Sequence, residues 1–94
     1  MKTKFSLQNQ TVIITGGGSG IGKAIAKTFG TQGADVHILD INIDKANKIA
    51  AEISSKGFKA KAYHCNVANY KQVSKIVNQI SEVSPVDILI NNAG

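Results

Sequence analysis

The stretch that most constrains this chain runs from residue 15 to residue 22 and reads Thr-Gly-Gly-Gly-Ser-Gly-Ile-Gly. The β-branched run at residues 11–14 comes before it and suits a buried parallel strand. A strand that turns through glycines into a helix forms an anion site, because the helix N-terminus directs free N–H groups and its positive dipole end at a phosphate. The stretch therefore predicts a phosphate-binding loop that suits a dinucleotide. The helix after it is expected to bury one face, made of Ile21, Ala24, Ile25, Thr28 and Phe29.

Two phosphate-binding motifs overlap in this stretch. Residues 17–23 fit the first seven positions of a P-loop, which binds ATP or GTP. The eighth position of that motif is a Ser or Thr whose hydroxyl binds magnesium, and here it is Ala24, which has no hydroxyl. The other interpretation is a dinucleotide-binding turn with glycines at positions 16, 20 and 22. We favour the dinucleotide, and a nucleotide-phosphate binder with a degenerate P-loop is an alternative.

Beyond the glycines, the pattern alternates between short strands and longer helices. Apolar or alternating runs predict strands at residues 35–39, 59–65 and 86–90. Two further helices are expected between them, with apolar positions at Ile43, Ala46, Ala50 and Ile53, and at Val73, Ile76, Val77 and Ile80.

The ends of the helices carry their own signals. Gly33 and Gly57 are expected to end the first two helices. Asn42 or Asp44 can cap the second helix, and residues 69–72, Asn-Tyr-Lys-Gln, are a candidate capping box for the third. Gly30, late in the first helix, is expected to allow close packing on the sheet.

This order of elements predicts an α/β fold with a parallel, doubly wound sheet of the Rossmann type. A phosphate loop after the first strand places the ligand crevice where the strand order reverses, so we expect the order 3-2-1-4. A βαβαβαβ arrangement is half of such a domain, and a fourth strand as apolar as residues 86–90 is an unusual open edge for a finished sheet. We therefore expect residues 1–94 to form the N-terminal half of a single dinucleotide-binding domain.

Asp40 ends the second predicted strand, about 20 residues after the glycine loop, where an acid binds the ribose hydroxyls of a dinucleotide. A carboxylate there accepts hydrogen bonds from both hydroxyls of NAD and repels the extra phosphate of NADP. The simpler alternative is a surface Asp that helps to begin the next helix.

Composition excludes several classes of protein. The formal net charge is +5, but all 11 basic residues are lysines and they are scattered. Since base readout and bidentate phosphate contacts favour arginine, we expect solvated helix faces and no nucleic-acid partner. No apolar run approaches a membrane span, and one cysteine fits a reducing compartment, so a cytoplasmic location without a membrane partner is expected.

The histidines and the cysteine do not suggest a metal site. His64 and Cys65 are adjacent on a predicted strand, so their side chains point to opposite faces and cannot bind one ligand together. His37 has no partner that the sequence reveals. We expect a packed cysteine and a partly exposed histidine.

The glycine stretch and the ending Asn91-Asn92-Ala93-Gly94 resemble the short-chain dehydrogenase/reductase family. The resemblance covers the whole chain but only the N-terminal part of such a protein. It implies that Asn66 and Val67 stand where the family has Asp-Val against the adenine, so the contact is kept without its charge. The cofactor-binding residues that we expect, with Asp40 included, are Gly16, Gly18, Ser19, Gly20, Ile21, Gly22, Asp40, Ile41, Asn66, Val67, Asn92, Ala93 and Gly94.

The resemblance also implies NAD rather than NADP as the cofactor. NADP-preferring members often carry a basic residue just before the middle glycine of the loop, and that position is Ser19 here. No basic residue directly follows Asp40, so a 2′-phosphate has no obvious cation to pair with.

The implied activity is reversible hydride transfer between a nicotinamide and an alcohol or ketone, such as a sugar, polyol, steroid or 3-oxoacyl thioester. The family uses a tyrosine with a lysine four residues later, and neither Tyr63 nor Tyr70 has one. We therefore expect no catalytic residue in these 94 residues. The resemblance also implies a homo-oligomer, commonly a tetramer, for the full-length enzyme. A non-catalytic dinucleotide-binding module or truncated product is the alternative.

Overall fold

The computed structural model describes residues 7–18 and 20–92. Four parallel strands form one sheet in the order β3-β2-β1-β4. This arrangement confirms the predicted α/β class and strand order. The elements along the chain are β1 (Thr11–Thr15), α1 (Gly20–Thr31), β2 (Asp35–Asp40), α2 (Ile43–Ser55), β3 (Lys59–His64), α3 (Tyr70–Val83) and β4 (Ile88–Asn91).

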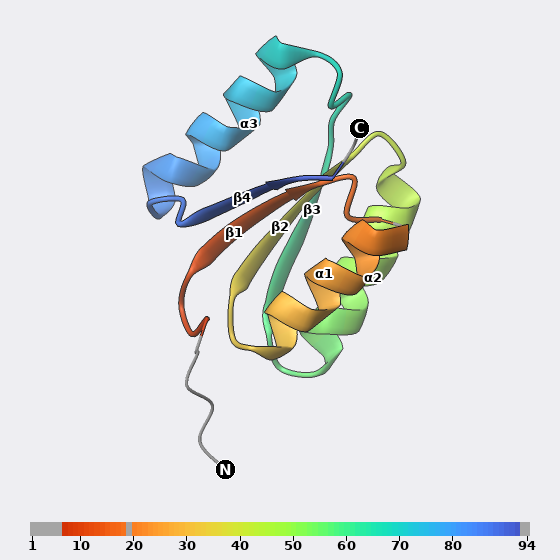
Figure 1. Ribbon diagram of the computed structural model, residues 1–94, viewed down its shortest axis with the longest axis vertical. Helices are drawn as coiled ribbons and strands as arrows, with labels where there is room; N and C mark the ends of the chain where they lie inside the picture. The colour runs from red at the N-terminus through yellow and green to blue at the C-terminus, as the bar shows by residue number, and fades with distance from the viewer. Residues whose placement is uncertain (1–6, 19, 93–94) are drawn as a thin grey trace.

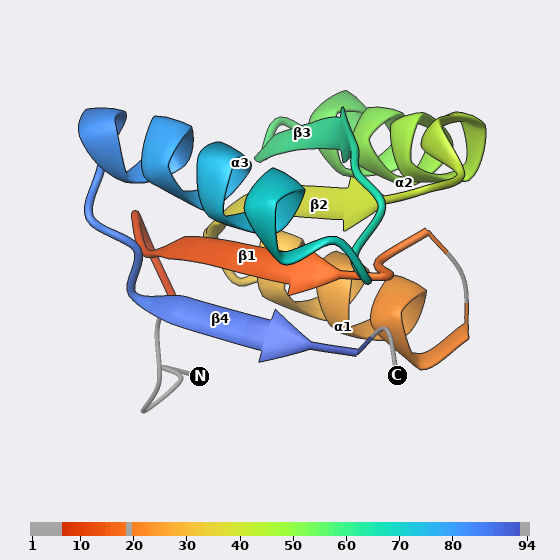
Figure 2. The same cartoon turned by 90° about the horizontal axis from the view of Figure 1, so that it is seen from above.

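The sheet separates two layers of helices, with α1 and α2 on one face and α3 on the other (Figures 1 and 2). Alternate residues of β1 point to opposite faces of the sheet. Val12 and Ile14 pack with α1 and α2, and Ile13 packs beneath α3. β1 is buried along its whole length because it lies in the middle of the sheet with helices on both sides. None of the helices in the described ranges is long and apolar enough to cross a membrane.

The buried face of α1 differs from the predicted one. Its buried residues are Gly22, Ala26 and Gly30, whereas Ile21 is 72% exposed and the predicted positions Ala24 and Thr28 are exposed as well. The physical reason is close approach, because a face of small residues lets the helix backbone lie against its neighbours where a branched side chain would hold it away. The remaining two predicted positions, Ile25 and Phe29, are half-buried and pack on the core beside this face.

Gly30 allows close packing between the two helices and not on the sheet, which corrects the sequence-based expectation. A Cβ atom at this position would lie 2.7 Å from Cγ2 of Ile53 in α2. The same pair of helices is joined at the surface by an ion pair between Lys27 and Glu52, with 3.0 Å between Nζ and Oε2.

The caps explain where the helices begin and end. Asn42 caps α2, since its side-chain oxygen accepts a hydrogen bond from the backbone N–H of Lys45 at 3.1 Å. Asn69 caps α3, accepting from the N–H of Lys71 and of Gln72. The predicted capping box is only half formed, because the Gln72 side chain accepts from the N–H of Asn66 instead of reaching back to Asn69. The predicted glycine stops adopt positive φ, with 92° at Gly33 and 87° at Gly57.

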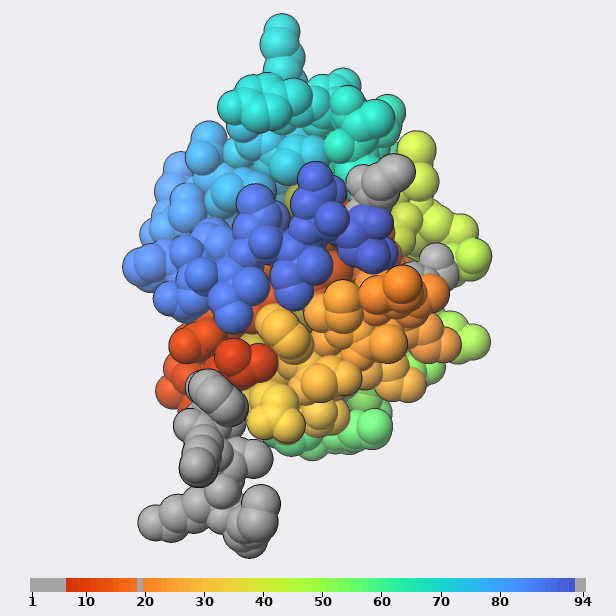
Figure 3. Space-filling model, in the orientation of Figure 1, coloured from red at the N-terminus to blue at the C-terminus, as the bar shows by residue number. Residues whose placement is uncertain are grey.

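The fourth strand begins at Ile88, two residues later than predicted. Asp87 lies just before the strand, and its side chain contacts the start of β1. Its Oδ2 accepts a hydrogen bond from the N–H of Thr11 at 2.8 Å. β4 lies at an edge of the described sheet, and its residues form the surface between α3 and α1 in Figure 3. Leu89 in this strand is 55% exposed.

Candidate dinucleotide-binding site

The turn from β1 into α1 leaves the sheet at the carboxyl ends of the strands (Figure 2). Its N–H at Gly16 donates to the carbonyl oxygen of Leu39 at 2.7 Å, which continues the pairing of β1 with β2 beyond the strand. Gly16 and Gly20 both adopt left-handed backbone conformations, with φ of 70° and 61°. Only glycine adopts these angles without strain, so the glycines at 16 and 20 are required by the path of the chain.

Gly22 is required for a different reason, which is lack of space. A Cβ atom there would collide with the carbonyl oxygen of Gly16 and would lie 2.6 Å from the side-chain nitrogen of Asn92. The first turn of α1 therefore rests directly on the glycine loop. Because the helix N-terminus lies so close, its free N–H groups and positive dipole end are available to a phosphate at the loop.

Asp40 joins the glycine loop to the start of α2. Its Oδ2 accepts a hydrogen bond from the N–H of Gly18 at 3.0 Å, and its Oδ1 accepts from the N–H of Asn42 at 2.9 Å. Both sequence-based interpretations of this residue are therefore compatible, since the carboxylate supports the start of the helix and lies beside the loop. Each carboxylate oxygen can accept more than one hydrogen bond, so ribose hydroxyls can still be bound there.

Asn91 and Asn92 hold the loop from the other side of β1. The hydroxyl of Thr15 donates to Oδ1 of Asn91 at 2.9 Å, and the N–H of Asn92 donates to that same hydroxyl oxygen at 3.1 Å. The side-chain amide of Asn92 donates to the carbonyl oxygen of Gly16 at 3.2 Å. The two asparagines therefore position the first glycine of the turn.

The other expected cofactor residues differ in their contacts and in how exposed they are. Asn66 directs its side-chain oxygen to the N–H of Ala68 at 3.1 Å, so that oxygen already stabilises the turn after β3. Val67 is half-buried and packs in the core beneath α3. Ile21 and Ile41 are exposed at the carboxyl edge of the sheet. Ser19, Ala93 and Gly94 lie outside the described residues.

Lysines lie closer to the loop than the sequence suggested. A cavity of about 260 Å³ opens beside the loop and shares Gly18 with the Asp40 site. The sequence places no lysine directly next to Ser19 or Asp40, but α1 and α2 bring together residues that are far apart in the sequence. The cavity is lined by Gly18, Gly20, Lys23, Lys45, Lys48 and Ile49.

Cys65 and His64 lie as predicted, with Cys65 fully buried and His64 exposed. Burial raises the pKa of the Cys65 thiol, which disfavours the thiolate that a nucleophile or metal ligand requires. Within residues 7–18 and 20–92, no group of three or more His, Cys, Asp or Glu side chains is placed to hold a metal ion. These observations give no support to a metal centre.

His37 does have partners, which corrects the sequence-based expectation. Its Nδ1 lies 2.8 Å from the hydroxyl oxygen of Tyr63, and its Nε2 lies 3.3 Å from Oδ2 of Asp35. The sequence carried one weak signal, because Asp35 and His37 are two positions apart on one strand and therefore share a face. The partner on β3 follows only from the register between the strands. The register pairs His37 with Lys61, and Tyr63 lies two positions further along β3 on the same face.

Comparison with known proteins agrees with the geometry of the loop. The chain is 46% identical over 89 residues to 7alpha-hydroxysteroid dehydrogenase of Escherichia coli, covering 94% of this chain and 35% of that protein. It is 42% identical over 97 residues to sorbose reductase sou1 of Schizosaccharomyces pombe, covering 38% of that protein. The chain thus spans about a third of the length of the curated relatives it matches.

A solved structure shows the same likeness in three dimensions. A 7alpha-hydroxysteroid dehydrogenase complexed with NADH and 7-oxo glycochenodeoxycholic acid superimposes with a TM-score of 0.89 at 46% sequence identity, covering 95% of this chain and 35% of that one. The family model described as short chain dehydrogenase matches residues 10–94. With its glycine turn, Asp40 and the Asn91–Asn92 pair in this arrangement, the chain belongs to the short-chain dehydrogenase family.

Proposed function

We propose that this chain binds NAD and is the cofactor-binding part of an oxidoreductase that transfers hydride between the nicotinamide and an alcohol or ketone. The observation that carries the proposal is the position of Asp40, whose carboxylate lies against Gly18 at the glycine turn. An acid at the end of the second strand beside a glycine turn suits the ribose of a dinucleotide. The solved relative that holds NADH supports the same class of cofactor.

The residues fit a dinucleotide because the glycines let the loop pack closely on Asp40 and on the start of α1. A Cβ at Gly18 or at Gly22 would meet another protein atom within 3 Å, so a side chain at either position would displace the loop. The pyrophosphate would lie at the N-terminus of α1, and Asp40 would accept hydrogen bonds from the ribose hydroxyls. Asn66 and Val67, at the carboxyl end of β3, would contact the adenine. Bound in this way, the cofactor supplies or accepts the hydride.

The preference for NAD over NADP depends on two opposing charges. The carboxylate of Asp40 repels a 2′-phosphate, whereas Lys45 and its neighbouring lysines attract one. We favour NAD because Asp40 lies directly at the loop and is fixed by two backbone N–H groups. Lys45 and Lys48 are exposed on α2 and Lys23 is half-buried on α1, so their charges are at least partly screened by water and salt.

Isothermal titration of the chain with NADH and with NADPH tests this proposal. NADH is expected to bind more tightly than NADPH. Asp40→Asn is expected to weaken NADH binding by roughly tenfold or more, because the ribose hydroxyls lose a charged acceptor and one of its two oxygens. Asp44→Asn, in the exposed first turn of α2, is the matched control and should leave the affinity almost unchanged. Equal binding of both cofactors would overturn the preference for NAD, and unchanged affinity in Asp40→Asn would overturn the ribose assignment.

The P-loop alternative is disfavoured by position. Ala24, which stands where that motif binds magnesium, is exposed on α1. Asp87 precedes β4 and binds the N–H of Thr11 at the opposite end of the sheet from the glycine turn. An acid there cannot help to hold a metal at the loop.

The remaining parts of the proposal concern the intact protein. The substrate would be a small-molecule alcohol or ketone, and the tyrosine and lysine that act on it would belong to residues other than these 94. The proposal includes a homo-tetramer. It also includes a cytoplasmic location, because a free thiol such as that of Cys65 is typical of a reducing compartment. An NAD-dependent alcohol oxidation assay of the intact protein tests the activity, and NAD binding without turnover would favour a non-catalytic module.

A further inference from the structure

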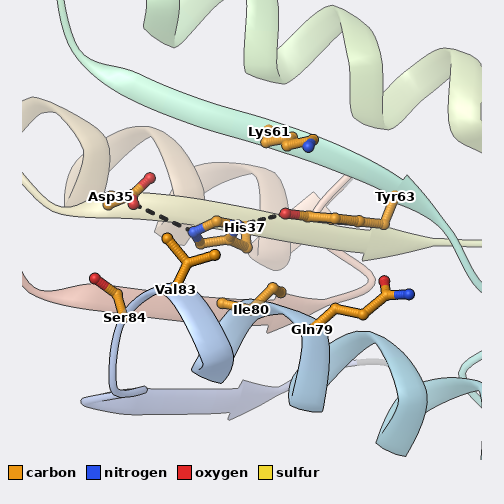
Figure 4. A pocket seen from close by; sticks show the side chains of 8 residues that line it. All are labelled: Asp35, His37, Lys61, Tyr63, Gln79, Ile80, Val83 and Ser84. Atoms are coloured by element: carbon orange, nitrogen blue, oxygen red, sulfur yellow. Dashed lines mark hydrogen bonds and ion pairs between the residues drawn. The ribbon is translucent and has the colours of Figure 1, made fainter.

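A second group of polar side chains lies on the opposite face of the sheet from α1 and α2. Asp35 and His37 on β2 form a chain of contacts with Tyr63 on β3, beneath the C-terminal half of α3 (Figure 4). His37 is central to it, with its two ring nitrogens 3.3 Å from the Asp35 carboxylate and 2.8 Å from the Tyr63 hydroxyl oxygen. Its side chain is only 12% exposed, so these contacts are largely shielded from water.

Only one of the two His37 contacts has hydrogen-bond geometry, the one between Nδ1 and the Tyr63 hydroxyl, and its direction depends on the tautomer of the ring. We assign the neutral tautomer with its hydrogen on Nε2, the nitrogen that lies 3.3 Å from the Asp35 carboxylate. In that tautomer Nδ1 accepts, and the Tyr63 hydroxyl donates to it. Burial, and then the negative charge of Asp35, raise the pKa of Tyr63, which keeps that hydroxyl protonated. The lone pairs of the Tyr63 oxygen are left for another donor.

These side chains border a cavity of about 250 Å³ between the sheet and α3. One side of the cavity is apolar, made by Ile80 and Val83 of α3 (Figure 4). The polar side presents Tyr63 and Lys61, whose Nζ lies 5.4 Å from the centre of the Tyr63 ring. The remaining lining residues are Asp35, His37, Gln79 and Ser84.

The size and lining of this cavity limit what it can hold. An apolar cavity of about 150 Å³ is enough for benzene, so this one suits a single ring with a small substituent. The ring would pack against Ile80 and Val83, and a hydroxyl on it would donate to the Tyr63 oxygen. The same hydroxyl oxygen could accept a hydrogen bond from Lys61 or Gln79. Asp35 and Lys61 bring opposite charges to the polar side, so the lining favours neither an anion nor a cation and a neutral molecule is the best match.

We propose that the cavity between β2, β3 and α3 binds a small neutral molecule with one ring and one hydroxyl group. None of the residues that line this cavity belongs to the proposed dinucleotide site, which lies at the carboxyl ends of the strands, whereas Asp35 begins β2. The two proposals are therefore separate, and failure of this one would leave the other untouched.

Titration of the ¹⁵N-labelled chain with phenol and with methoxybenzene, followed by NMR, tests the proposal. The two probes have similar rings, but only phenol can donate a hydrogen bond. Phenol is expected to shift the amide signals of β2, β3 and the end of α3 in a saturable way. It should bind roughly fivefold more tightly than methoxybenzene, the effect of one net hydrogen bond.

Tyr63→Phe removes the acceptor and should make the two probes bind equally. Tyr70→Phe, on an exposed side chain at the start of α3, is the matched control and should keep the preference for phenol. Long-range ¹H–¹⁵N correlation spectra of His37 provide a readout that needs no variant, and a hydrogen on Nε2 is expected. Absence of saturable shifts with phenol, equal binding of both probes to the unsubstituted chain, or a hydrogen on Nδ1 alone would each overturn the proposal.

Discussion

The side-chain amide of Asn92 donates a hydrogen bond to the carbonyl oxygen of Gly16, 76 positions earlier in the sequence, at 3.2 Å. The contact joins the end of β4 to the first glycine of the turn after β1. It gives the second asparagine a physical role that does not require direct contact with a ligand, since the position of Gly16 sets the path of the whole loop.

Asn92→Ala is therefore expected to loosen the glycine turn. Loss of this side-chain bond leaves the Gly16 carbonyl without that donor and should cost about 1 kcal/mol of folding free energy. If the same free energy is lost from cofactor binding, NADH affinity should fall roughly fivefold. Urea unfolding and NADH titration measure both effects, with the exposed Asn47→Ala on α2 as control. An affinity equal to that of the control would contradict a positioning role.

Gly22→Ala tests the requirement for space at the start of α1. The added methyl group would meet the Gly16 carbonyl and the Asn92 amide, so the helix and loop must separate. Overpacking of this kind typically costs about 1–3 kcal/mol, and dinucleotide binding should be largely lost. Thr28→Ala, at an exposed position of the same helix, should change neither property appreciably. Crystals of the variant with an undisturbed loop would contradict the steric interpretation.

The stability of the fold is expected to fall in strongly alkaline solution. Because the folded-state pKa of Tyr63 is raised, the unfolded chain loses this proton first as the pH increases. The stabilisation that the Tyr63 hydroxyl contributes to folding is fully present below about pH 10, the usual pKa of tyrosine. It is lost as the pH rises through the folded-state pKa of Tyr63. Unfolding free energies measured between pH 9 and pH 11 should decline less steeply in Tyr63→Phe than in Tyr70→Phe. Both variants keep Cys65, whose pKa is raised in the same direction, so the difference isolates Tyr63.

The exposed edge of β4 predicts self-association of the chain. Leu89 is 55% exposed on a strand that has a partner on one side only within the described sheet. Leu89→Lys should reduce aggregation, measured by light scattering, while leaving the melting temperature nearly unchanged. Ile90→Lys, at a half-buried position of the same strand, should lower the melting temperature instead. Undiminished aggregation in Leu89→Lys would show that another surface is responsible.

Local signals in the sequence were sufficient for the elements and their order. The glycine turn, the caps at Asn42 and Asn69 and the apolar periods each depend on residues a few positions apart. The strand order followed from one further principle, that the ligand crevice lies where the order reverses. The position of Asp40 beside the turn was predicted in the same way, from its distance to the turn and its place at the end of a strand, and its role toward a ribose stays a prediction.

Features that depend on packing between elements could not be predicted in this way. The buried face of α1 is set by how closely the helix approaches its neighbours, and small residues carry little signal in an apolar period. Three lysines from α1 and α2 border one cavity only because the two helices lie side by side. His37 meets Tyr63 through the register of β2 and β3, which no local pattern specifies.

The long separation between the glycine turn and its two asparagines has a consequence for synthesis on the ribosome. At about 5–20 residues per second, the ribosome needs roughly 4–15 s to add the 76 residues between Gly16 and Asn92. During that interval β1 and α1 exist without the strand that locks the turn between them. A nascent chain is therefore expected to acquire its affinity for the cofactor late and in one step, when β4 joins β1. Cofactor capture would then mark a chain that has been translated at least as far as Asn92.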